Sequence, residues 1–521
     1  MRVEIRDNTM VQKCYRKQIT KYERACKVMD WSNYGDKIYG CWLGKAIGGT
    51  MGLATEGVKE FANLPLKYPD GIEANDDLDL QLVWLDLLKE KGVRITSDDL
   101  AERWAKNTAY YVDEYNVVTA NIRARLRPPV TGYYNNWFTR GMGAPIRSEI
   151  WACITPGRPE AAAYYAYQDA SVDHWGEGVY GEIFLAALES MAFEESNLRV
   201  LISDAAEFIP QSSQVFEVAQ LSIQCFTKGL TLYESREKIL ARFGRHNFTD
   251  CIQNIGFILL GLLYGEGDFL KTIISAINCG YDGDCTGATS GSIMGIILGR
   301  QQIERIQSTN VNENVVVGRE IKDVTPPQTL TELTEQTMEI GRQIAQNKNM
   351  PTLPKPFVLP EIPKFEPPLC LRFLISDAME QDADYESAFG WQEAVFDDSY
   401  MELNRYFGNS GPKAIFLHTE FRVPADGVYK LFPSSNDGVT LWVDGEQVLL
   451  HHEHGEFLPA LHRPGSPIAD VYLKSGWHDI IIKVLRCDRP LEFGWIVADE
   501  GKYLVMDAEY RYPKTLALSE R

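Results

Sequence analysis

The sequence has few features of a secreted or membrane-bound protein. Its ten cysteines are scattered and form no CxxC pair, which argues against a disulfide framework. Its most apolar stretches, within residues 255–264 and 293–298, are shorter than the roughly 20 residues that a membrane-spanning helix needs. Residues 1–26 are charged throughout and lack the apolar run of a secretion signal. We therefore expect a cytoplasmic protein that does not enter a membrane.

Positive charge is also scarce. The chain has 52 Lys and Arg residues against 72 Asp and Glu residues, a formal net charge of −20. This excess of negative charge repels nucleic acid and anionic lipid, so we expect neither as a partner. It still allows a small anionic ligand to bind locally to arginines or helix N-termini. At 521 residues the chain exceeds a single hydrophobic core, which predicts two or more domains.

The first two thirds of the sequence carry the apolar spacing of helices. This spacing predicts helices over residues 80–88, 100–112, 178–192, 269–277 and 330–346. Gly92 is placed to end the first of them, and Thr329 to cap the start of the last. Seven prolines then fall within residues 350–368, where neither a helix nor a central strand tolerates them. We expect an all-α domain over residues 1–348 and a linker over residues 349–368.

The apolar period falls to two beyond the linker. It predicts strands over residues 428–432, 439–443, 448–450 and 479–485. Asp-Gly pairs at 426–427, 437–438 and 444–445 supply turn signals between them. Short strands at this spacing predict a β-sandwich over residues 369–521.

Two series of glycines run through the helical part. Gly40, Gly44, Gly48 and Gly52 recur every four residues, and Gly287, Gly291, Gly295 and Gly299 do the same. Residues four apart share a helix face, so each series leaves a bare strip where another helix can approach closely. The sequence does not decide whether the two strips face each other.

Two acidic clusters lie about two hundred residues apart: Asn75-Asp76-Asp77 and Asp282-Gly283-Asp284-Cys285-Thr286. Carboxylates this close repel one another unless a proton or a cation lies between them, and hard cations such as Mg²⁺ or Mn²⁺ prefer oxygen ligands. The clusters therefore predict one metal site assembled from both.

Each cluster is also compatible with a role that involves no metal. The first cluster could only cap a helix, and the second could be a polar loop before a helix that begins near Thr286. Asp-x-Asp-x-Thr also resembles the nucleophile motif of haloacid-dehalogenase-type phosphatases. That motif should follow a buried strand, whereas residues 269–279 have a helical pattern.

Five elements within residues 36–300 resemble, in order, the ADP-ribosylglycohydrolase family. They are the glycine series from Gly40 to Gly52 with Glu56 at the next step of four, Asn75-Asp76-Asp77, the segment Gly141-Met142-Gly143-Ala144-Pro145-Ile146-Arg147, the pair Asp173-His174, and Asp282-x-Asp284. The resemblance implies an all-α globule with two divalent cations, magnesium or manganese, at the bottom of a cleft.

The resemblance also implies roles for individual residues. The metal ligands would be Asp76, Asp77, Asp282 and Asp284, joined by Asn75, Cys285 and Thr286, and Asp77 and Asp284 would also be catalytic. Glu56 would be the acid/base residue; otherwise it is an exposed carboxylate at a helix end. Gly141, Met142, Gly143 and His174 would line the substrate cleft, although His174 could instead be a core histidine. Arg147 would be a structural or phosphate-facing neighbour, or equally a buried ion-pair partner.

The chain departs from the family pattern around the expected metals. The family usually has threonine where this chain has Asn75, Leu78 and Cys285, and aspartate where it has Gly49. The amide of Asn75 can still offer an oxygen, Leu78 cannot ligate, and Cys285 offers soft sulfur unless Thr286 replaces it. We therefore expect the second metal to bind weakly, in a shifted position, or to be another cation.

The C-terminal strands resemble a second known module, the protective-antigen-type carbohydrate-binding β-sandwich. Residues 423–429, 434–439, 441–445 and 473–478 carry the resemblance, which implies a carbohydrate ligand. Trp442 or Trp477 could stack on a sugar, although packing in the core is the commoner fate of tryptophan. His451, His452 and His454 could bind a transition metal or simply lie in a solvated loop.

These observations predict a divalent-metal-dependent hydrolase that cleaves a glycosidic bond at ribose or a ribose-like sugar. Its substrate would be a sugar, a nucleotide sugar or an ADP-ribosylated molecule. One alternative is a glycosidase acting on nucleoside or glycan-derived substrates. The other is a protein that binds ADP-ribose or carbohydrate without cleaving it.

Overall fold

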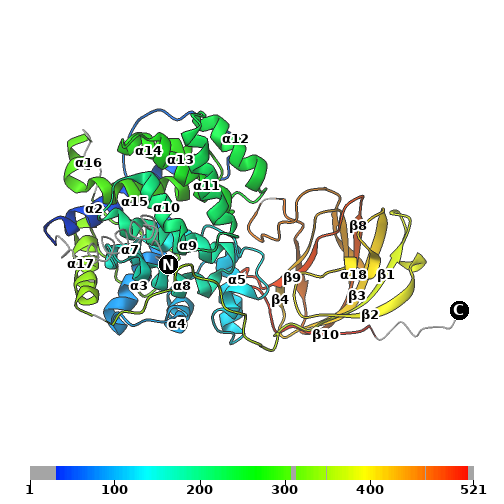
Figure 1. Cartoon of the computed structure of the whole chain (residues 1–521). Helices are drawn as coiled ribbons and strands as arrows, with labels where there is room; N and C mark the ends of the chain where they lie inside the picture. The colour runs from blue at the N-terminus through cyan, green and yellow to red at the C-terminus, as the bar shows by residue number, and fades with distance from the viewer. Residues whose placement is uncertain (1–30, 307–312, 348, 464, 514–521) are drawn as a thin grey trace, which may run out of the picture.

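The computed structural model describes residues 31–306, 313–347, 349–463 and 465–513. The predicted absence of a secretion signal in residues 1–26 concerns a segment outside this part. Within it, a helical domain is followed by a domain of antiparallel sheets, and the two lie against each other (Figure 1). None of the described helices is both long enough and apolar enough to span a bilayer.

The helical domain contains one dominant hydrophobic core, to which nearly all of its helices contribute. Its elements are α2 (Trp31–Gly52), α3 (Asp76–Lys91), α4 (Ser97–Asn107), α5 (Asp113–Arg123), α6 (Val130–Tyr133), η1 (Pro145–Arg147), α7 (Ser148–Ile154), α8 (Pro159–Asp173), α9 (Glu177–Ala192), α10 (Leu198–Ala206), α11 (Gln214–Thr227), α12 (Leu232–Phe243), α13 (Cys251–Tyr264), α14 (Phe269–Ile277), α15 (Gly283–Leu298), α16 (Arg300–Ile306) and α17 (Leu330–Gln346).

Most of the predicted helices are confirmed, together with their end signals. The Gly92 N–H donates to the Leu88 carbonyl at the end of α3, and the Thr329 hydroxyl accepts from the Glu332 N–H at the start of α17. The helix predicted over residues 100–112 is wrong beyond residue 107. The chain there turns extended, because Thr108 and Ala109 pair with the backbone of Ile321 and Glu320 instead.

The two glycine strips face each other, which the sequence alone did not decide. Helices α2 and α15 run antiparallel along them, so that Gly40 lies against Gly295, Gly44 against Gly291 and Gly48 against Gly287. A Cβ added at Gly44 would overlap the Gly291 carbonyl oxygen, so the two backbones meet with no room for side chains. This contact holds the N-terminal end of α15 beside the C-terminal end of α2.

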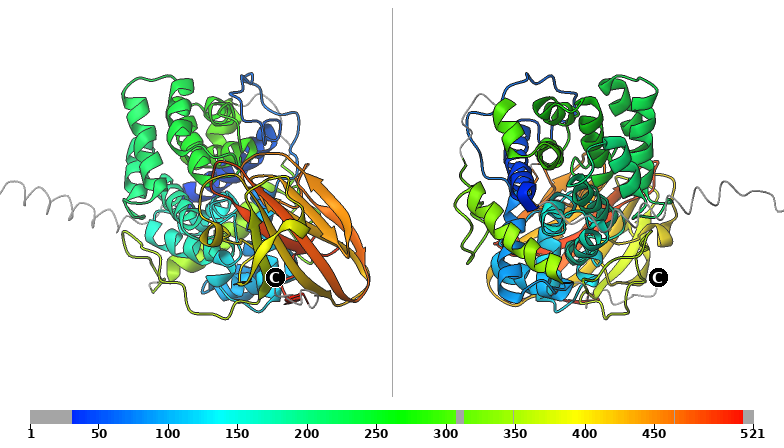
Figure 2. Two further views of the ribbon diagram at one scale, coloured as in Figure 1. Left: turned by 90° about the vertical axis from the view of Figure 1, so that its right-hand side faces the viewer. Right: turned by 60° about the vertical axis from the view of Figure 1, so that its left-hand side comes forward.

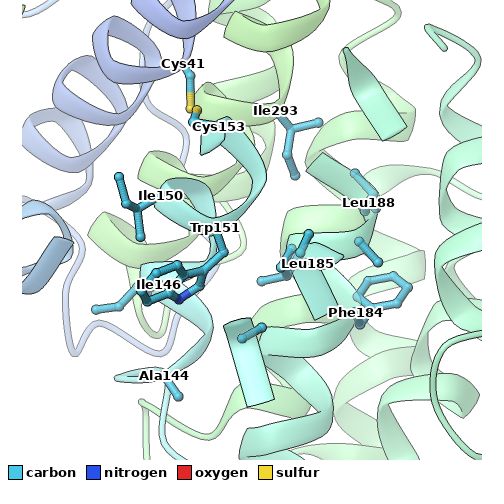
Figure 3. Packing of buried hydrophobic residues seen from close by; sticks show 14 of the residues in the cluster. Cys41, Ala144, Ile146, Ile150, Trp151, Cys153, Phe184, Leu185, Leu188 and Ile293 are labelled. Carbon is cyan, nitrogen blue, oxygen red and sulfur yellow. The ribbon is translucent and has the colours of Figure 1, made fainter. Parts of the chain in front are cut away.

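Helix α7 and the residues just before it pack in the hydrophobic core next to this helix pair. Ile146, Ile150 and Trp151 are buried, and Figure 3 shows them beside Leu185 and Leu188 of α9. The sulfur atoms of Cys41 on α2 and Cys153 on α7 point toward each other, and both are free thiols. The tight apolar packing places the polar residues of this segment, Arg147 and Glu149, at fixed positions in the interior.

The segment after α17 contains no helix or strand over residues 349–370, as its prolines predict. It lies along the helical domain instead of crossing open solvent. The Phe357 N–H donates to the Phe208 carbonyl, and the Phe357 ring packs edge-on against Tyr167.

The C-terminal domain consists of two antiparallel sheets that share a core, to which strands of both contribute. One sheet has the order β2-β1-β3-β8-β5-β6, with β10 also paired to β3, and the other has the order β7-β4-β9. Its elements are β1 (Leu371–Ala378), η2 (Tyr385–Ser387), β2 (Phe389–Phe396), α18 (Asn404–Phe407), β3 (Lys413–Val423), β4 (Gly427–Ser435), β5 (Val439–Val443), β6 (Glu446–His451), β7 (Ala469–Leu473), β8 (Gly476–Arg486), β9 (Phe493–Ala498) and β10 (Glu509–Arg511). The four predicted strands correspond to β4, β5, β6 and β8.

Candidate active site

The two acidic clusters of the sequence meet where the N-terminal ends of α3 and α15 adjoin. The Asn75 side-chain amide donates to Asp284 Oδ2 at 3.2 Å, which ties one cluster to the other. Asn75 Oδ1 also caps α3 by accepting from the Asp77 N–H at 2.8 Å. Ligand atoms of Asp77, Asp284 and Cys285 all lie within 4.8 Å of one another. Helix α15 begins at Gly283, three residues before the predicted start, so Asp284 and Cys285 lie in its first turn.

Several carboxylate oxygens at this junction are buried without a hydrogen bond. Both oxygens of Asp77, Oδ2 of Asp282 and Oδ1 of Asp284 have no hydrogen-bond donor among the described residues. These three residues are at most 4% exposed. Buried carboxylate oxygens are otherwise nearly always hydrogen-bonded, because leaving an acceptor unsatisfied costs about 1–3 kcal/mol. The donor set therefore fits a cation that prefers oxygen ligands.

The carboxyl groups raise one another's pKa. Burial, followed by the charges of Asp284, Asp79 and Glu56, raises the pKa of Asp76 to about 8. Burial raises the pKa of Asp77 and of Asp282 well above the usual aspartate range, and Asp284 adds to the effect in each case. The cluster thus concentrates more negative charge than its surroundings neutralise, which is the condition under which a site takes up protons or a metal ion.

Glu56 lies on the turn that follows α2, beside the junction. The turn that carries it is attached to the start of α15, because the Gly57 N–H donates to the Tyr281 carbonyl and the Tyr281 N–H to the Val58 carbonyl. Glu56 is exposed, yet partial burial and the charge of Asp284 raise its pKa to about 7. A carboxyl group with such a pKa can both donate and accept a proton near neutral pH.

Lys45 is the buried cation nearest to the cluster. Its ammonium group donates to Glu149 Oε1 at 2.9 Å and lies 3.6 Å from Asp77 Oδ1. Burial lowers the pKa of Lys45, but Glu149 and Asp77 outweigh this effect and raise it overall, so the lysine stays charged. The Gln81 side-chain amide donates to Glu149 Oε2 at 3.0 Å and to the Asp77 carbonyl at 2.8 Å, so it links these two residues.

Two of the departures from the family pattern, Gly49 and Asn75, adjoin each other. A Cβ added at Gly49 would lie 3.0 Å from the Asn75 side-chain nitrogen, so the glycine leaves the room that Asn75 occupies. Leu78 is buried in the apolar core. Burial, followed by the nearby aspartates, raises the pKa of the Cys285 thiol, and the Thr286 hydroxyl donates to the Gly283 carbonyl at 3.2 Å.

The predicted substrate segment lies over a buried acid and a buried histidine. A Cβ at Gly141 would stand 3.1 Å from Glu114 Oε1 and 3.2 Å from His174 Nε2, and one at Gly143 would overlap the Glu114 carboxylate. His174 Nδ1 lies 3.0 Å from Asp173 Oδ1. Burial raises the pKa of Glu114 to about 7, against the opposing effect of His174. Because Gly141 and Gly143 have no side chain, the backbone of this segment can lie in contact with Glu114 and His174.

Two residues of this segment point into the interior. The Arg147 side chain is fully buried, and its Nη2 lies 2.9 Å from Asp169 Oδ1 and 2.8 Å from Asp173 Oδ1. Its Nη1 donates to the Gly143 carbonyl at 2.6 Å, so Arg147 holds the glycine segment in place. These contacts describe the buried ion-pair partner, one of the two roles that the sequence left open. The Met142 side chain lies in the core, so only its backbone could face a substrate.

A second group of metal-ligand side chains lies in the β domain. Asp437, His454 and Cys487 place ligand atoms within 4.8 Å of one another. The Asp437 oxygens already accept hydrogen bonds, Oδ1 from Arg489 Nη2 and Oδ2 from the Cys487 N–H at 2.9 Å. The exposed His454 therefore lies beside a carboxylate whose two oxygens already accept hydrogen bonds from other groups. Trp477 is half-buried with Arg511 over its ring, and Trp442 is also half-buried, in β5.

The alternative based on haloacid-dehalogenase-type phosphatases is excluded by the secondary structure. The segment before Asp282 is helix α14, not the buried strand that the motif requires. The sequence interpretation also missed Lys45, Glu149, Gln81 and Glu114. Their only signal was that each interrupts an otherwise buried helical stretch with a charged or polar side chain, which also occurs in ordinary cores.

Comparisons with known proteins bear on the helical domain most directly. Residues 30–340 match the family model of ADP-ribosylglycohydrolase. Among solved structures, an ADP-ribosylglycohydrolase-related protein complex is similar with 19% identity and a TM-score of 0.41, covering 60% of this chain and 99% of its own.

Two further solved structures share less with the chain. One is the β-glucosidase from Kluyveromyces marxianus in complex with glucose, with 14% identity and a TM-score of 0.19, covering 24% of this chain and 15% of its own. The other is the PA14 domain of the MpAFP antifreeze protein, with 12% identity and a TM-score of 0.20, covering 30% of this chain and 100% of its own. No curated protein matches the sequence.

Proposed function

Because this chain belongs to the ADP-ribosylglycohydrolase family, we propose that it is a metal-dependent glycosyl hydrolase acting at ribose or a ribose-like sugar. The observation that carries the proposal is the set of buried carboxylate oxygens without hydrogen bonds, which α3 and α15 bring together from distant parts of the chain. We also propose that the protein works in the cytoplasm, where its free thiols stay reduced.

Asp76, Asp77, Asp282 and Asp284 would hold one or two divalent cations, Mg²⁺ or Mn²⁺, with Asn75, Cys285 and Thr286 beside them. Bound cations would orient the sugar hydroxyls and stabilise negative charge as it develops. Cys285 places sulfur where such a cation prefers oxygen, so we expect the position next to it to be the weaker of two.

Glu56 is the residue we propose for proton transfer. Its solvent access lets it reach a substrate and a water molecule, and its pKa of about 7 suits it to hold or release a proton at its carboxyl oxygen. Gly141 and Gly143 would bring backbone groups against the substrate above Glu114 and His174. Lys45 would limit the repulsion at Asp77 without leaving the interior.

Turnover tests the proposal directly. The full-length protein would be incubated with ADP-ribosylated arginine, ADP-ribosylated serine, nucleosides and 4-nitrophenyl ribofuranoside, with EDTA, Mg²⁺ or Mn²⁺. We expect hydrolysis of at least one substrate, dependent on the cation and abolished in Glu56→Gln. Tight cation binding without hydrolysis of any of them would refute the hydrolase and favour a protein that only binds its ligand.

A further inference from the structure

A cleft of about 280 Å³ lies between the helical domain and the β domain. The lining from the helical domain is residues 137–138 and 140–141 with Arg245, Asn247 and Asp250, and the lining from the β domain is Tyr400, residues 456–459 and Glu492. This volume is close to the lower end of the roughly 300–1,000 Å³ of small-molecule sites, which suits one or two sugar rings.

The walls of this cleft are held by contacts between the domains. The Ser399 N–H donates to Asn135 Oδ1 at 2.8 Å, and Arg463 Nη2 donates to Asn247 Oδ1 at 2.9 Å. Val117 and Phe138 of the helical domain form an apolar cluster with Ala460 of the β domain. The two domains therefore pack directly against each other (Figures 1 and 2), and the cleft lies beside these contacts.

Aromatic side chains from both domains line the cleft. Tyr400 and Phe457 pack edge to face with their ring centroids 5.5 Å apart, and both are only half-buried. Trp137 lines the side of the helical domain and is also half-buried. Half-exposed aromatic rings in a cleft offer flat apolar faces on which a sugar ring can stack.

The charged groups of the lining favour a neutral ligand over an anionic one. Asp250 accepts from Arg140 Nε at 2.9 Å and from its Nη2 at 3.2 Å, so this pair is neutral overall. The remaining charges are Arg245 on one side and Glu456 and Glu492 on the other, all exposed. The carboxylates of Glu456 and Glu492 can accept hydrogen bonds from sugar hydroxyls and disfavour a phosphate group beside them, and Arg140 is already paired with Asp250.

We propose that this interdomain cleft binds a neutral sugar and thereby selects the substrate of the hydrolase. The proposal rests on the proposed function, because Gly141, which lines the cleft and adjoins Glu114 and His174, is one of the two glycines proposed above to meet the substrate. The β domain then supplies one wall of the substrate site, and a glycan-derived glycoside is preferred over a nucleotide sugar.

Saturation-transfer NMR on the full-length protein tests this, with the aromatic protons irradiated. The probes are glucose, galactose, xylose, cellobiose and maltose, with glucose 6-phosphate and ADP-ribose as anionic counterparts. We expect transfer to at least one neutral sugar and at least tenfold weaker binding of its phosphorylated form. Phe457→Ala should weaken the sugar at least tenfold, Phe457→Tyr should retain binding, and Tyr472→Ala, at an exposed tyrosine on β7, should change nothing.

Absence of transfer to every neutral sugar would overturn the proposal, as would equal or tighter binding of the phosphorylated ligands. Unchanged sugar binding in Phe457→Ala would do the same, provided that the variant keeps the wild-type melting temperature. Hydrolysis is measured separately, so the two proposals fail separately. Sugar binding without turnover would refute the hydrolase, and turnover without sugar binding would refute the role of the cleft.

Discussion

The two groups of metal-ligand side chains, Asp77-Asp284-Cys285 and Asp437-His454-Cys487, have similar compositions. They differ in whether their buried carboxylate oxygens accept hydrogen bonds. At the junction of α3 and α15, the oxygens of Asp77 are buried and accept no hydrogen bond. In the β domain, Asp437 is equally buried, yet its oxygens accept from Arg489 and from the Cys487 N–H. A carboxylate whose acceptors are satisfied stabilises a turn, whereas one left unsatisfied is suited to a ligand.

The largest expected difference between the two groups is in catalysis. Asp284→Asn removes a charge from the proposed metal site, so we expect activity to fall by roughly a thousandfold or more. We expect cation affinity to fall by at least the roughly 10–100-fold that changes in supporting residues cause. Asp437→Asn is the matched control and should leave both unchanged. Calorimetric titration with Mn²⁺ and a turnover assay measure the two effects; equal cation affinity in wild type and Asp284→Asn would reject the site.

A second difference is in the response to pH. Folded-state pKa values raised to about 7 and about 8 mean that Glu56 and Asp76 hold protons that the unfolded chain would release. The contribution of these two groups to the stability of the metal-free protein is therefore fully present below about pH 4, where both are also protonated in the unfolded chain, and it is lost as the pH rises through 7–8. A cation must displace these protons, so its affinity should rise about tenfold per pH unit between pH 6 and 8 if one proton leaves.

Melting temperatures at pH 6 and pH 8, with EDTA and with Mn²⁺, check this prediction. We expect the metal-free protein to melt lower at pH 8 and the stabilisation by Mn²⁺ to be larger there. Asp437 accepts hydrogen bonds, so the Asp437→Asn variant should show the same pH trend as wild type. Stabilisation by Mn²⁺ that does not change with pH would contradict the proton displacement.

A third and smaller difference is in stability. Asp437→Ala leaves Arg489 and the Cys487 N–H without their acceptor, so we expect a loss of about 1–3 kcal/mol in the free energy of unfolding. Asp77→Ala removes repulsion from the neighbouring carboxylates that Lys45 offsets only in part, so it should cost less. Urea denaturation in EDTA measures both variants. A larger loss in Asp77→Ala than in Asp437→Ala would reverse the comparison.

The smallest expected effect concerns the choice of cation. Cys285→Thr replaces a soft sulfur by an oxygen beside Asp77 and Asp284, so affinity for Mn²⁺ or Mg²⁺ should rise a few-fold and affinity for Cd²⁺ should fall. Cys487→Thr in the β domain is the matched control and should alter neither. Competition titrations of Mn²⁺ against Cd²⁺ give the ratio, and an unchanged ratio would show that Cys285 is not a ligand.

Local patterns predicted much of the fold. The change of apolar period near residue 350 separated the helical domain from the sheets, and α9, α14 and α17 lie where the spacing placed them. Strands such as β3 and β9 were missed, because strands buried on both faces lack the alternation that marks a half-buried one. The helix predicted through residue 112 failed because a tertiary pairing with residues 320–321 took over the backbone.

For the candidate site, the sequence by itself determined which residues are proposed to carry the chemistry: two acidic clusters and the Gly141–Gly143 segment, with two glycine strips beside them. Only the tertiary structure decided that the strips pack face to face, that Lys45 and Glu149 lie behind Asp77, and that a cleft opens between the domains. The reason is physical. Period and turn chemistry act over a few residues, whereas burial, charge pairing and close backbone contact depend on segments that meet only when the chain is folded.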